Sequence, residues 1–259
     1  TVMLVGFVNS GIMKLSQAIG VIMGANIGTT ATGWILSLSG LKGNGIMAVF
    51  SPDFFTPVLA IIGVVLVMFT KSDRKRTFGT ILLGFSLLMF GMNMMSNAAE
   101  GLKDNAAFRE FMVMFTNPFL GVLVGALLTA ILQSSSVSIG ILQTLARETG
   151  TITYQIALPI ILGQNIGSCV TALISSIGAN KSAKRVAIVH LYFNVIGTIV
   201  FLSLFYLVNA LIDLPFMEQQ LEATGIAVIH TCFNLLVTLL FLPFTKQLEK
   251  LACLTVRDK

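Results

Sequence analysis

The stretch Gln133-Ser134-Ser135-Ser136 decides the fold of this chain. It interrupts Phe111–Ala146, a run of 36 residues without one charged side chain. A helix crosses the hydrocarbon core of a bilayer with about 20 apolar residues, so this run is too long for a single crossing. Backbone that is not helical is stable at membrane depth only where protein or a water-filled cavity surrounds it. We therefore predict a re-entrant hairpin with the four polar residues at its tip.

The predicted hairpin has two arms, Pro118–Leu132 leading to the tip and Val137–Ala146 leading away from it. A helix that begins at such a tip presents free backbone N–H groups and the positive end of its dipole there. The serine hydroxyls add further hydrogen-bond donors at the same place. This combination is typical of an anion-binding site.

Composition places the whole chain in the class of polytopic membrane proteins. The mean hydropathy is +0.90, and 55% of the residues are hydrophobic while only 10% are charged. The net charge of +5 is not interpreted as a nucleic-acid-binding feature, because the basic residues can be sorted by side of the membrane.

The three cysteines have neither disulfide-framework nor metal-ligand spacing, so we interpret them as packing residues. The chain starts at Thr1 inside an apolar segment without a signal peptide, which indicates a fragment.

Windows free of charged residues mark the expected membrane segments, so we predict an all-α fold. The windows are Leu15–Leu41, Phe54–Thr70, Thr77–Ala99, Phe111–Ala146, Thr149–Asn180, Val186–Ile212 and Ala223–Thr245.

The basic residues between these windows indicate the sidedness. If 111–146 returns to its own side, the basic loops at 71–76 and 181–185 and the tail from Lys246 all lie on the cytoplasmic side, as the positive-inside rule favours. Twelve of the sixteen Lys and Arg residues then lie inside, and only four lie outside. A single crossing by 111–146 would put the two basic loops on opposite sides. The four outside residues are Lys42, Lys103, Arg109 and Arg147.

An internal repeat relates the two halves of the chain. The segment 24–32, GANIGTTAT, matches the segment 163–171, GQNIGSCVT, at a constant offset of 139 positions. The predicted topology runs these segments in opposite directions, which is the inverted-repeat arrangement that builds transport sites at the midplane. The same offset puts the partner of the 133–136 tip before Thr1, so we expect the first hairpin tip to be missing from the chain.

Each repeat segment carries features of a broken, oxygen-rich helix. Glycines at positions 20, 24 and 28 and at 163 and 167 would let helices approach closely. Asn-Ile-Gly within an apolar span weakens a helix and predicts a break in both segments. Gln164, Ser168 and Thr171 share one helical face, and Ala25, Thr29 and Thr32 share the corresponding one. Uncharged oxygen ligands of this kind suit a hard monovalent cation such as sodium.

The windows contain no Asp, Glu, Lys or Arg, and this absence predicts that an anion and a cation bind together. A polyanion held without a basic side chain must rely on N–H groups, hydroxyls and a cation bound beside it. Each ion then favours the binding of the other. The only ionisable candidates are His190 and His230, in the related segments HLYFN and HTCFN. We interpret these segments as polar contacts between helices, and a proton relay is the alternative.

The tip and the two repeat segments together resemble the type II sodium-dependent phosphate cotransporters, over Val5 to about Phe244. The resemblance implies a secondary transporter that moves inorganic phosphate with Na⁺ by alternating access, with no enzymatic activity and no organic cofactor. It implies a multi-pass protein of the cell membrane, with the lipid bilayer, phosphate and sodium as partners and no nucleic acid. Carried over by position, the implied phosphate ligands are Gln133, Ser134, Ser135, Ser136, Asn26 and Thr30, and the implied sodium ligands are Thr29, Gln164, Asn165, Ser168 and Thr171.

The expected organisation follows from the same resemblance. Residues 1–117 would form the first inverted repeat without its hairpin tip, plus connecting helices, and 118–245 the second repeat with two following helices. The tail 246–259 would be cytoplasmic and could begin a C-terminal regulatory domain, and a homodimer is a further candidate. Two features depart from the family: the first Gln-Ser-Ser-Ser is absent, and Cys169 stands where a threonine is more usual.

Other functions remain open from the residues alone. The same hairpins could carry a dicarboxylate or an acidic amino acid, although such a site would be expected to hold a fixed basic residue. A serine of the tip could be an enzyme nucleophile, but it would need a base such as His190 or His230 within hydrogen-bond reach. A channel is a third alternative. The serines could also bond to preceding carbonyls and only bend a helix.

Overall fold

A computed structural model of the chain describes residues 1–40 and 52–257. Within these ranges the fold is helical, with no strand and one isolated bridge between Thr153 and Gln220. The end of the first predicted window, Leu41, and the basic residue Lys42 lie outside the described residues, as do the last two positions of the predicted tail. The elements are α1 Val2–Asn9, α2 Leu15–Ser37, η1 Leu38–Gly40, α3 Pro52–Phe69, α4 Asp73–Glu100, α5 Ala106–Val113, η3 Met114–Thr116, α6 Pro118–Leu132, α7 Ser135–Thr149, α8 Tyr154–Gly167, α9 Cys169–Ser175, α10 Lys181–Ile212, α11 Ala223–Phe241, η4 Leu242–Phe244 and α12 Thr245–Thr255.

The prediction of an all-α polytopic membrane protein is confirmed. Five helical stretches of the described chain are long and apolar enough to cross a membrane, and α3 is a shorter apolar helix. The segment Ala106–Thr116 joins α6 at a bend of 110°. Asn117 produces this bend, because its side chain accepts from the backbone N–H groups of Phe119 and Leu120 and so caps α6. The five stretches are Leu15–Ser37, Asp73–Glu100, Tyr154–Ser175, Lys181–Ile212 and Ala223–Thr255.

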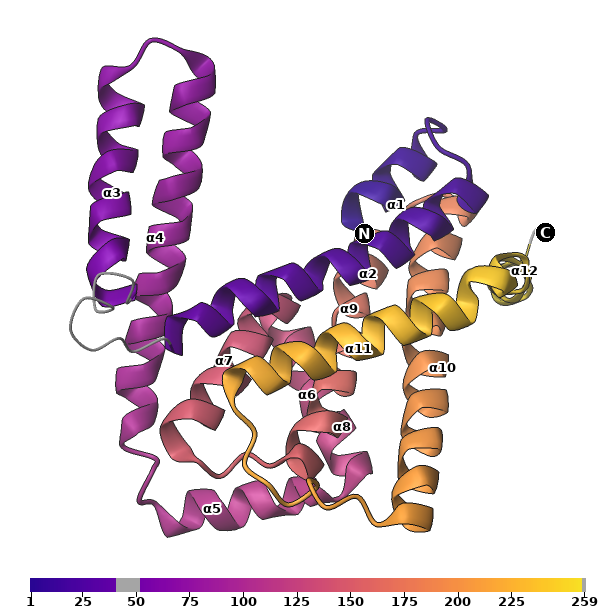
Figure 1. Ribbon diagram of the computed structural model, residues 1–259. Helices are drawn as coiled ribbons and strands as arrows, with labels where there is room; N and C mark the ends of the chain where they lie inside the picture. The colour runs from indigo at the N-terminus through magenta and orange to yellow at the C-terminus, as the bar shows by residue number, and fades with distance from the viewer. Residues whose placement is uncertain (41–51, 258–259) are drawn as a thin grey trace.

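The connections lie along two opposite edges of the molecule (Figure 1). The α1–α2, α3–α4 and α9–α10 connections lie along the upper edge of the view, whereas α5 and the α7–α8 and α10–α11 connections lie along the lower edge. The outer ends of α6 and α7 both lie at the lower edge. This arrangement groups the basic loops at 71–76 and 181–185 on one edge, as the predicted sidedness requires.

The repeat is visible in the element bounds. Leu15 begins α2 and Tyr154 begins α8, which are 139 positions apart, so α2 corresponds to α8 and α9 together. In Figure 1, α2 leads away from the upper edge while α8 leads toward it. The predicted break at Asn-Ile-Gly is wrong for the first repeat, because α2 continues through it without interruption. In the second repeat the helix is interrupted only at Ser168.

The close packing of α6 against α8 depends on glycine. A Cβ added to Gly125 would lie 2.1 Å from the carbonyl oxygen of Ile160, and one added to Gly163 would lie 2.1 Å from that of Val122. Backbone therefore meets backbone at both positions, which confirms the predicted role of Gly163 in helix approach. A Cβ on Gly20, Gly24 or Gly28 of α2 would meet nothing within 4 Å in the described residues, so the same prediction is not supported there.

The predicted tail folds back onto the helices. Helix α12 buries Leu248 and Ala252 and packs against α10 and α2. Arg185, at the start of α10, donates to the carbonyl oxygen of Val256 from Nε at 3.0 Å and from Nη2 at 2.8 Å. The hydroxyl groups of Tyr192 and Thr255 are 2.7 Å apart. These contacts fix the end of the described chain beside the core.

Candidate functional site

The tip of the predicted hairpin is a two-residue turn. Helix α6 ends at Leu132, and Gln133 adopts the left-handed conformation with φ 54° and ψ 22°. Ser134 is extended and caps α7, since its Oγ accepts from the backbone N–H of Val137 at 3.3 Å. A non-glycine residue in the left-handed region is uncommon, and here it lets the chain turn back within the charge-free run. The prediction of an interrupted run is therefore confirmed.

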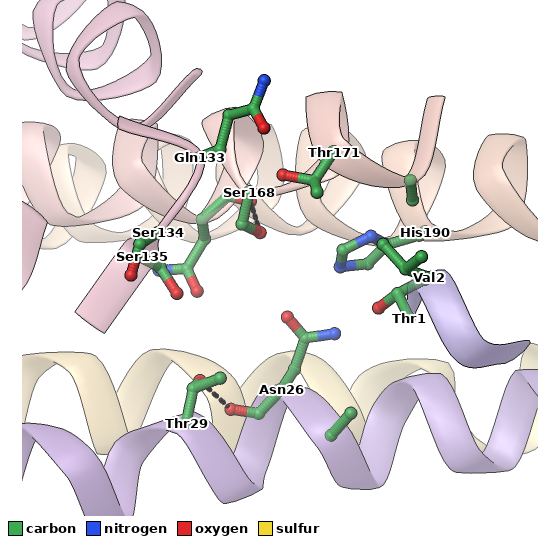
Figure 2. Close-up of a pocket in the computed structure, with 13 residues that line it drawn as sticks. Thr1, Val2, Asn26, Thr29, Gln133, Ser134, Ser135, Ser168, Thr171 and His190 are labelled. Atoms are coloured by element: carbon green, nitrogen blue, oxygen red, sulfur yellow. Dashed lines mark hydrogen bonds between the residues drawn. The ribbon is translucent and has the colours of Figure 1, made fainter. Parts of the chain in front are cut away.

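The turn places the N-terminus of α7 at the wall of a cavity. Helix α7 begins at Ser135, two residues earlier than predicted, and has 15 residues. Its first-turn N–H groups have no partner within the helix, and its dipole is positive at this end. Ser134 and Ser135 both line the cavity and point toward its interior (Figure 2).

The cavity has a volume of about 300 Å³ and lies between elements of both repeats. Figure 2 shows the hairpin tip on one side, α2 below, and His190 with the start of the chain on the side opposite the tip. Its size is equivalent to on the order of ten water molecules, so a small oxyanion and a monovalent cation fit together. The lining residues are Thr1, Val2, Ala25, Asn26, Thr29, Gln133, Ser134, Ser135, Asn165, Ser168, Thr171, Ala172 and His190.

Two pairs of lining residues make matching bonds in the two repeats. Asn26 Nδ2 donates to the carbonyl oxygen of Ile22 at 2.9 Å, and Asn165 Nδ2 donates to that of Ile161 at 2.9 Å. In each repeat the hydroxyl three positions further on then bonds back to the asparagine. Thr29 Oγ1 donates to the Asn26 carbonyl at 2.6 Å, and Ser168 Oγ donates to the Asn165 carbonyl at 2.6 Å. The two walls of the cavity therefore carry the same pair of internal bonds.

These bonds fix what each wall can offer a ligand. A hydroxyl has one hydrogen to donate and two lone pairs. Thr29 and Ser168 use their hydrogens on backbone carbonyls, so they present oxygen lone pairs to the cavity. Ser134 uses its oxygen to accept from Val137, which leaves its O–H free to donate. Acceptors therefore line the two repeat segments, and donors gather at the hairpin tip.

Three of the predicted site residues lie away from this cavity. Gln164 donates from Nε2 to the carbonyl oxygen of Ser138 at 3.0 Å and holds α8 against α7. Thr30 is buried and donates to the Ile27 carbonyl at 2.6 Å. Ser136 lines a separate, mainly apolar cavity beside α4. The other eight predicted residues, which line the polar cavity, are Asn26, Thr29, Gln133, Ser134, Ser135, Asn165, Ser168 and Thr171.

The related His-containing segments have different positions in the site. His230 Nε2 lies 3.3 Å from Asn165 Oδ1, so it forms the interhelical polar contact that the sequence predicted. Asn194 makes a similar interhelical contact, since its Nδ2 lies 3.3 Å from Cys169 Sγ. His190 lines the cavity instead, and sequence reasoning gave no ligand role to it. The repeated His-x-x-x-Asn spacing could not have identified it, because His230 has the same spacing.

Comparison with known proteins points to one family. The model of the family described as Na⁺/Pi-cotransporter matches residues 1–97 and 87–222. The uncharacterized protein YqeW of Bacillus subtilis is 31% identical over 197 residues, which are 76% of this chain and 60% of YqeW. Sodium-dependent phosphate transport protein 2C of Homo sapiens is 40% identical over 111 residues, 41% of this chain and 18% of that protein.

A candidate inorganic phosphate export protein, YjbB of Salmonella typhimurium, is 26% identical over 214 residues, which are 82% of this chain and 37% of YjbB. The chain thus spans 60% of YqeW and little more than a third of YjbB. No solved structure matches the chain.

Proposed function

The chain belongs to the Na⁺/Pi-cotransporter family, and we propose that it carries out sodium-coupled transport of inorganic phosphate across the cell membrane by alternating access. The observation that carries the proposal is the single cavity lined by the hairpin tip and by the Asn-Ile-Gly segments of both repeats. Two relatives named for phosphate transport or export support phosphate as the cargo.

The hairpin tip provides the anion-binding part of the proposed site. Ser134 and Ser135 line the cavity at the first turn of α7, where the helix dipole favours negative charge. Neither hydroxyl hydrogen is used by a bond within the described residues. Gln133 lies at the same turn and lines the cavity with an amide that can donate to the anion. Phosphate at this tip is held by neutral donors.

The acceptor walls provide the cation-binding part. Thr29 and Ser168 present oxygen lone pairs, and Asn26 and Thr171 line the cavity beside them. Sodium, a hard cation, is suited to such oxygen ligands. Among the described residues no Asp, Glu, Lys or Arg side chain lines the cavity. A phosphate dianion held without a basic side chain is stabilised by a cation bound beside it, so phosphate and sodium each strengthen the binding of the other.

Alternating access is supported by the relation between the repeats. Transporters built from inverted repeats move one repeat or bundle against the other around a central site. The hairpin contributes one side of this cavity, and α2 of the opposite repeat contributes another. A serine nucleophile is not favoured, because no hydrogen bond joins a tip serine to His190 or His230 in the described part of the chain.

The proposal is tested by phosphate uptake into proteoliposomes that contain the full-length protein. Uptake of labelled phosphate should require an inward sodium gradient and should be lost in Ser135→Ala and Gln133→Ala. The control is Ser203→Ala on α10, an exposed serine away from the cavity, which should transport normally. Normal uptake by both tip variants would exclude the tip as the phosphate site. Strong competition by succinate or aspartate would indicate a carrier of dicarboxylates or acidic amino acids instead.

A further inference from the structure

Two histidines of this protein have the same local structure. His190 on α10 and His230 on α11 are each followed four residues later by a buried asparagine. Asn194 Nδ2 donates to the His190 carbonyl at 3.0 Å, and Asn234 Nδ2 donates to the His230 carbonyl at 2.8 Å. Both imidazole rings are buried, at 4% and 1% residue exposure. Because their local structure is the same, any difference in role between the two histidines comes from what each ring contacts.

The two rings differ in their partners. His230 Nε2 contacts Asn165 Oδ1 at 3.3 Å, so this ring bridges α11 and α8. His190 Nδ1 is buried and has no hydrogen-bond partner within the described residues. The His190 ring lines the polar cavity and projects toward it from the side opposite Ser134 and Ser135 (Figure 2). Because protein covers Nδ1, the ring nitrogen that a ligand in the cavity can reach is Nε2, which also has no hydrogen-bond partner within the described residues. A buried polar ring without a partner is unfavourable, so a ligand that accepts a hydrogen bond from Nε2 would stabilise this position of His190.

The chemistry of imidazole limits what this partner is. A hard cation such as sodium prefers oxygen ligands, so the ring nitrogen is a poor sodium ligand. A neutral imidazole always carries one N–H donor. The acceptors that line the cavity, Thr29 and Ser168, already suit the cation. An oxyanion has the oxygen atoms that an N–H donor requires.

We propose that His190 is a direct contact for the bound oxyanion and donates a ring N–H to one phosphate oxygen, on the side of the ion away from the hairpin tip. This inference rests on the proposed function of the cavity. The anion is then bound from two elements that are far apart in sequence, α7 and α10. Because the bound ion contacts both elements, it links the hairpin to α10.

The test uses the full-length protein, inorganic phosphate, and three variants on one helix. His190→Leu removes the donor and keeps an apolar side chain of similar reach, while His190→Gln restores an N–H donor. The matched control is Thr198→Val, which removes a buried hydroxyl without a described partner from the same helix and does not line the cavity. Each purified variant is first checked for folding by its thermal unfolding in sodium without phosphate. Phosphate affinity is then measured at saturating sodium, and sodium affinity at saturating phosphate.

His190→Leu should weaken phosphate affinity by about ten-fold or more, because a hydrogen bond to a charged group is lost. His190→Gln should recover part of the loss, and Thr198→Val should match the wild type. An unchanged phosphate affinity in His190→Leu, or an equal loss in Thr198→Val, overturns the role of His190 while the proposed function stands. A wild-type protein that binds no phosphate in sodium overturns the proposed function itself, and the proposal for His190 with it.

Discussion

Helix α2 and the α8–α9 pair carry the same sequence pattern and make the same internal bonds, but their surroundings differ. Asn26 and Asn165 both bond to the carbonyl four residues earlier, at 2.9 Å. Yet α2 is continuous and 39% buried over its most apolar window, whereas α8–α9 is interrupted at Ser168 and 72% buried. Side-chain-to-backbone bonds are therefore set by local sequence, while continuity and burial are set by which helices pack alongside.

The second difference lies in how each asparagine side chain is held. Asn165 Oδ1 has a donor in His230, and no described residue contacts Asn26 Oδ1 in the same way. Both Nδ2 and Oδ1 of Asn165 thus have hydrogen-bond partners. Only Nδ2 of Asn26 has one, and the Asn26 side chain points toward the cavity (Figure 2). The two walls are matched in composition but not in how firmly each asparagine is held, and the more firmly held wall is the one that packs against both arms of the hairpin.

The largest expected effect concerns the glycines of the two segments. Gly163→Ala places a Cβ 2.1 Å from the Val122 carbonyl oxygen, and neither backbone can move aside cheaply. We expect a loss of about 1–3 kcal/mol of stability or more. Gly24→Ala meets nothing within 4 Å and should be neutral or slightly stabilising, since alanine favours helix. Thermal unfolding of both variants in detergent measures the difference.

An equal loss in the two glycine variants would contradict this asymmetry. It would show that α2 has a packing partner outside the described residues, comparable to α6 on α8.

The second prediction tests whether both walls bind sodium. Ser168→Ala and Thr29→Ala each remove one hydroxyl oxygen from the cavity. Each should raise the sodium concentration for half-maximal phosphate uptake by on the order of ten-fold, as expected for a lost ligand. The matched controls are Ser175→Ala and Ser37→Ala, whose hydroxyls make the same kind of bond to the carbonyl three residues earlier but do not line the cavity. A shift in only one repeat would assign sodium to that wall alone.

The smallest expected effect concerns the extra contact of the second repeat. His230→Leu removes the donor to Asn165 Oδ1 and leaves that oxygen without its described partner. The expected loss is about 1 kcal/mol of stability, the usual contribution of one hydrogen bond. His230→Gln should restore part of it. Chemical unfolding of the three proteins checks this, and identical midpoints for His230→Leu and the wild type would show that the contact contributes nothing.

The hairpin could be predicted from sequence because its causes are local. A charge-free run that is too long for one crossing, Pro118 at the start of an arm and four polar residues at the tip gave the bounds of α6 correctly. The start of α7 was two residues in error, because Ser134 caps the helix and Ser135 and Ser136 already belong to it. The break predicted at Asn26 does not occur, and the local bonds do not explain the difference, because Asn26 and Asn165 make the same bond while only the second helix is interrupted.

The site could be predicted only in part, because helix rotation is a tertiary property. The face through Gln164 and Ser168 was chosen by helical spacing, but packing against α7 turns Gln164 toward Ser138 and leaves Asn165 at the cavity. Ser136 belongs to the same polar tip as Ser135 yet lies against α4. His190 and His230 have the same spacing in sequence, and only the fold decides which of them lines the cavity.

The central claim is that the hairpin tip and the two repeat segments form one site in which phosphate and sodium depend on each other. It is tested most directly by the thermal stability of the purified full-length protein, with phosphate added in sodium or in choline. Phosphate should raise the unfolding temperature in sodium and not in choline, and Ser135→Ala should abolish the rise. An equal rise in both salts, or a rise that survives Ser135→Ala, would contradict the claim.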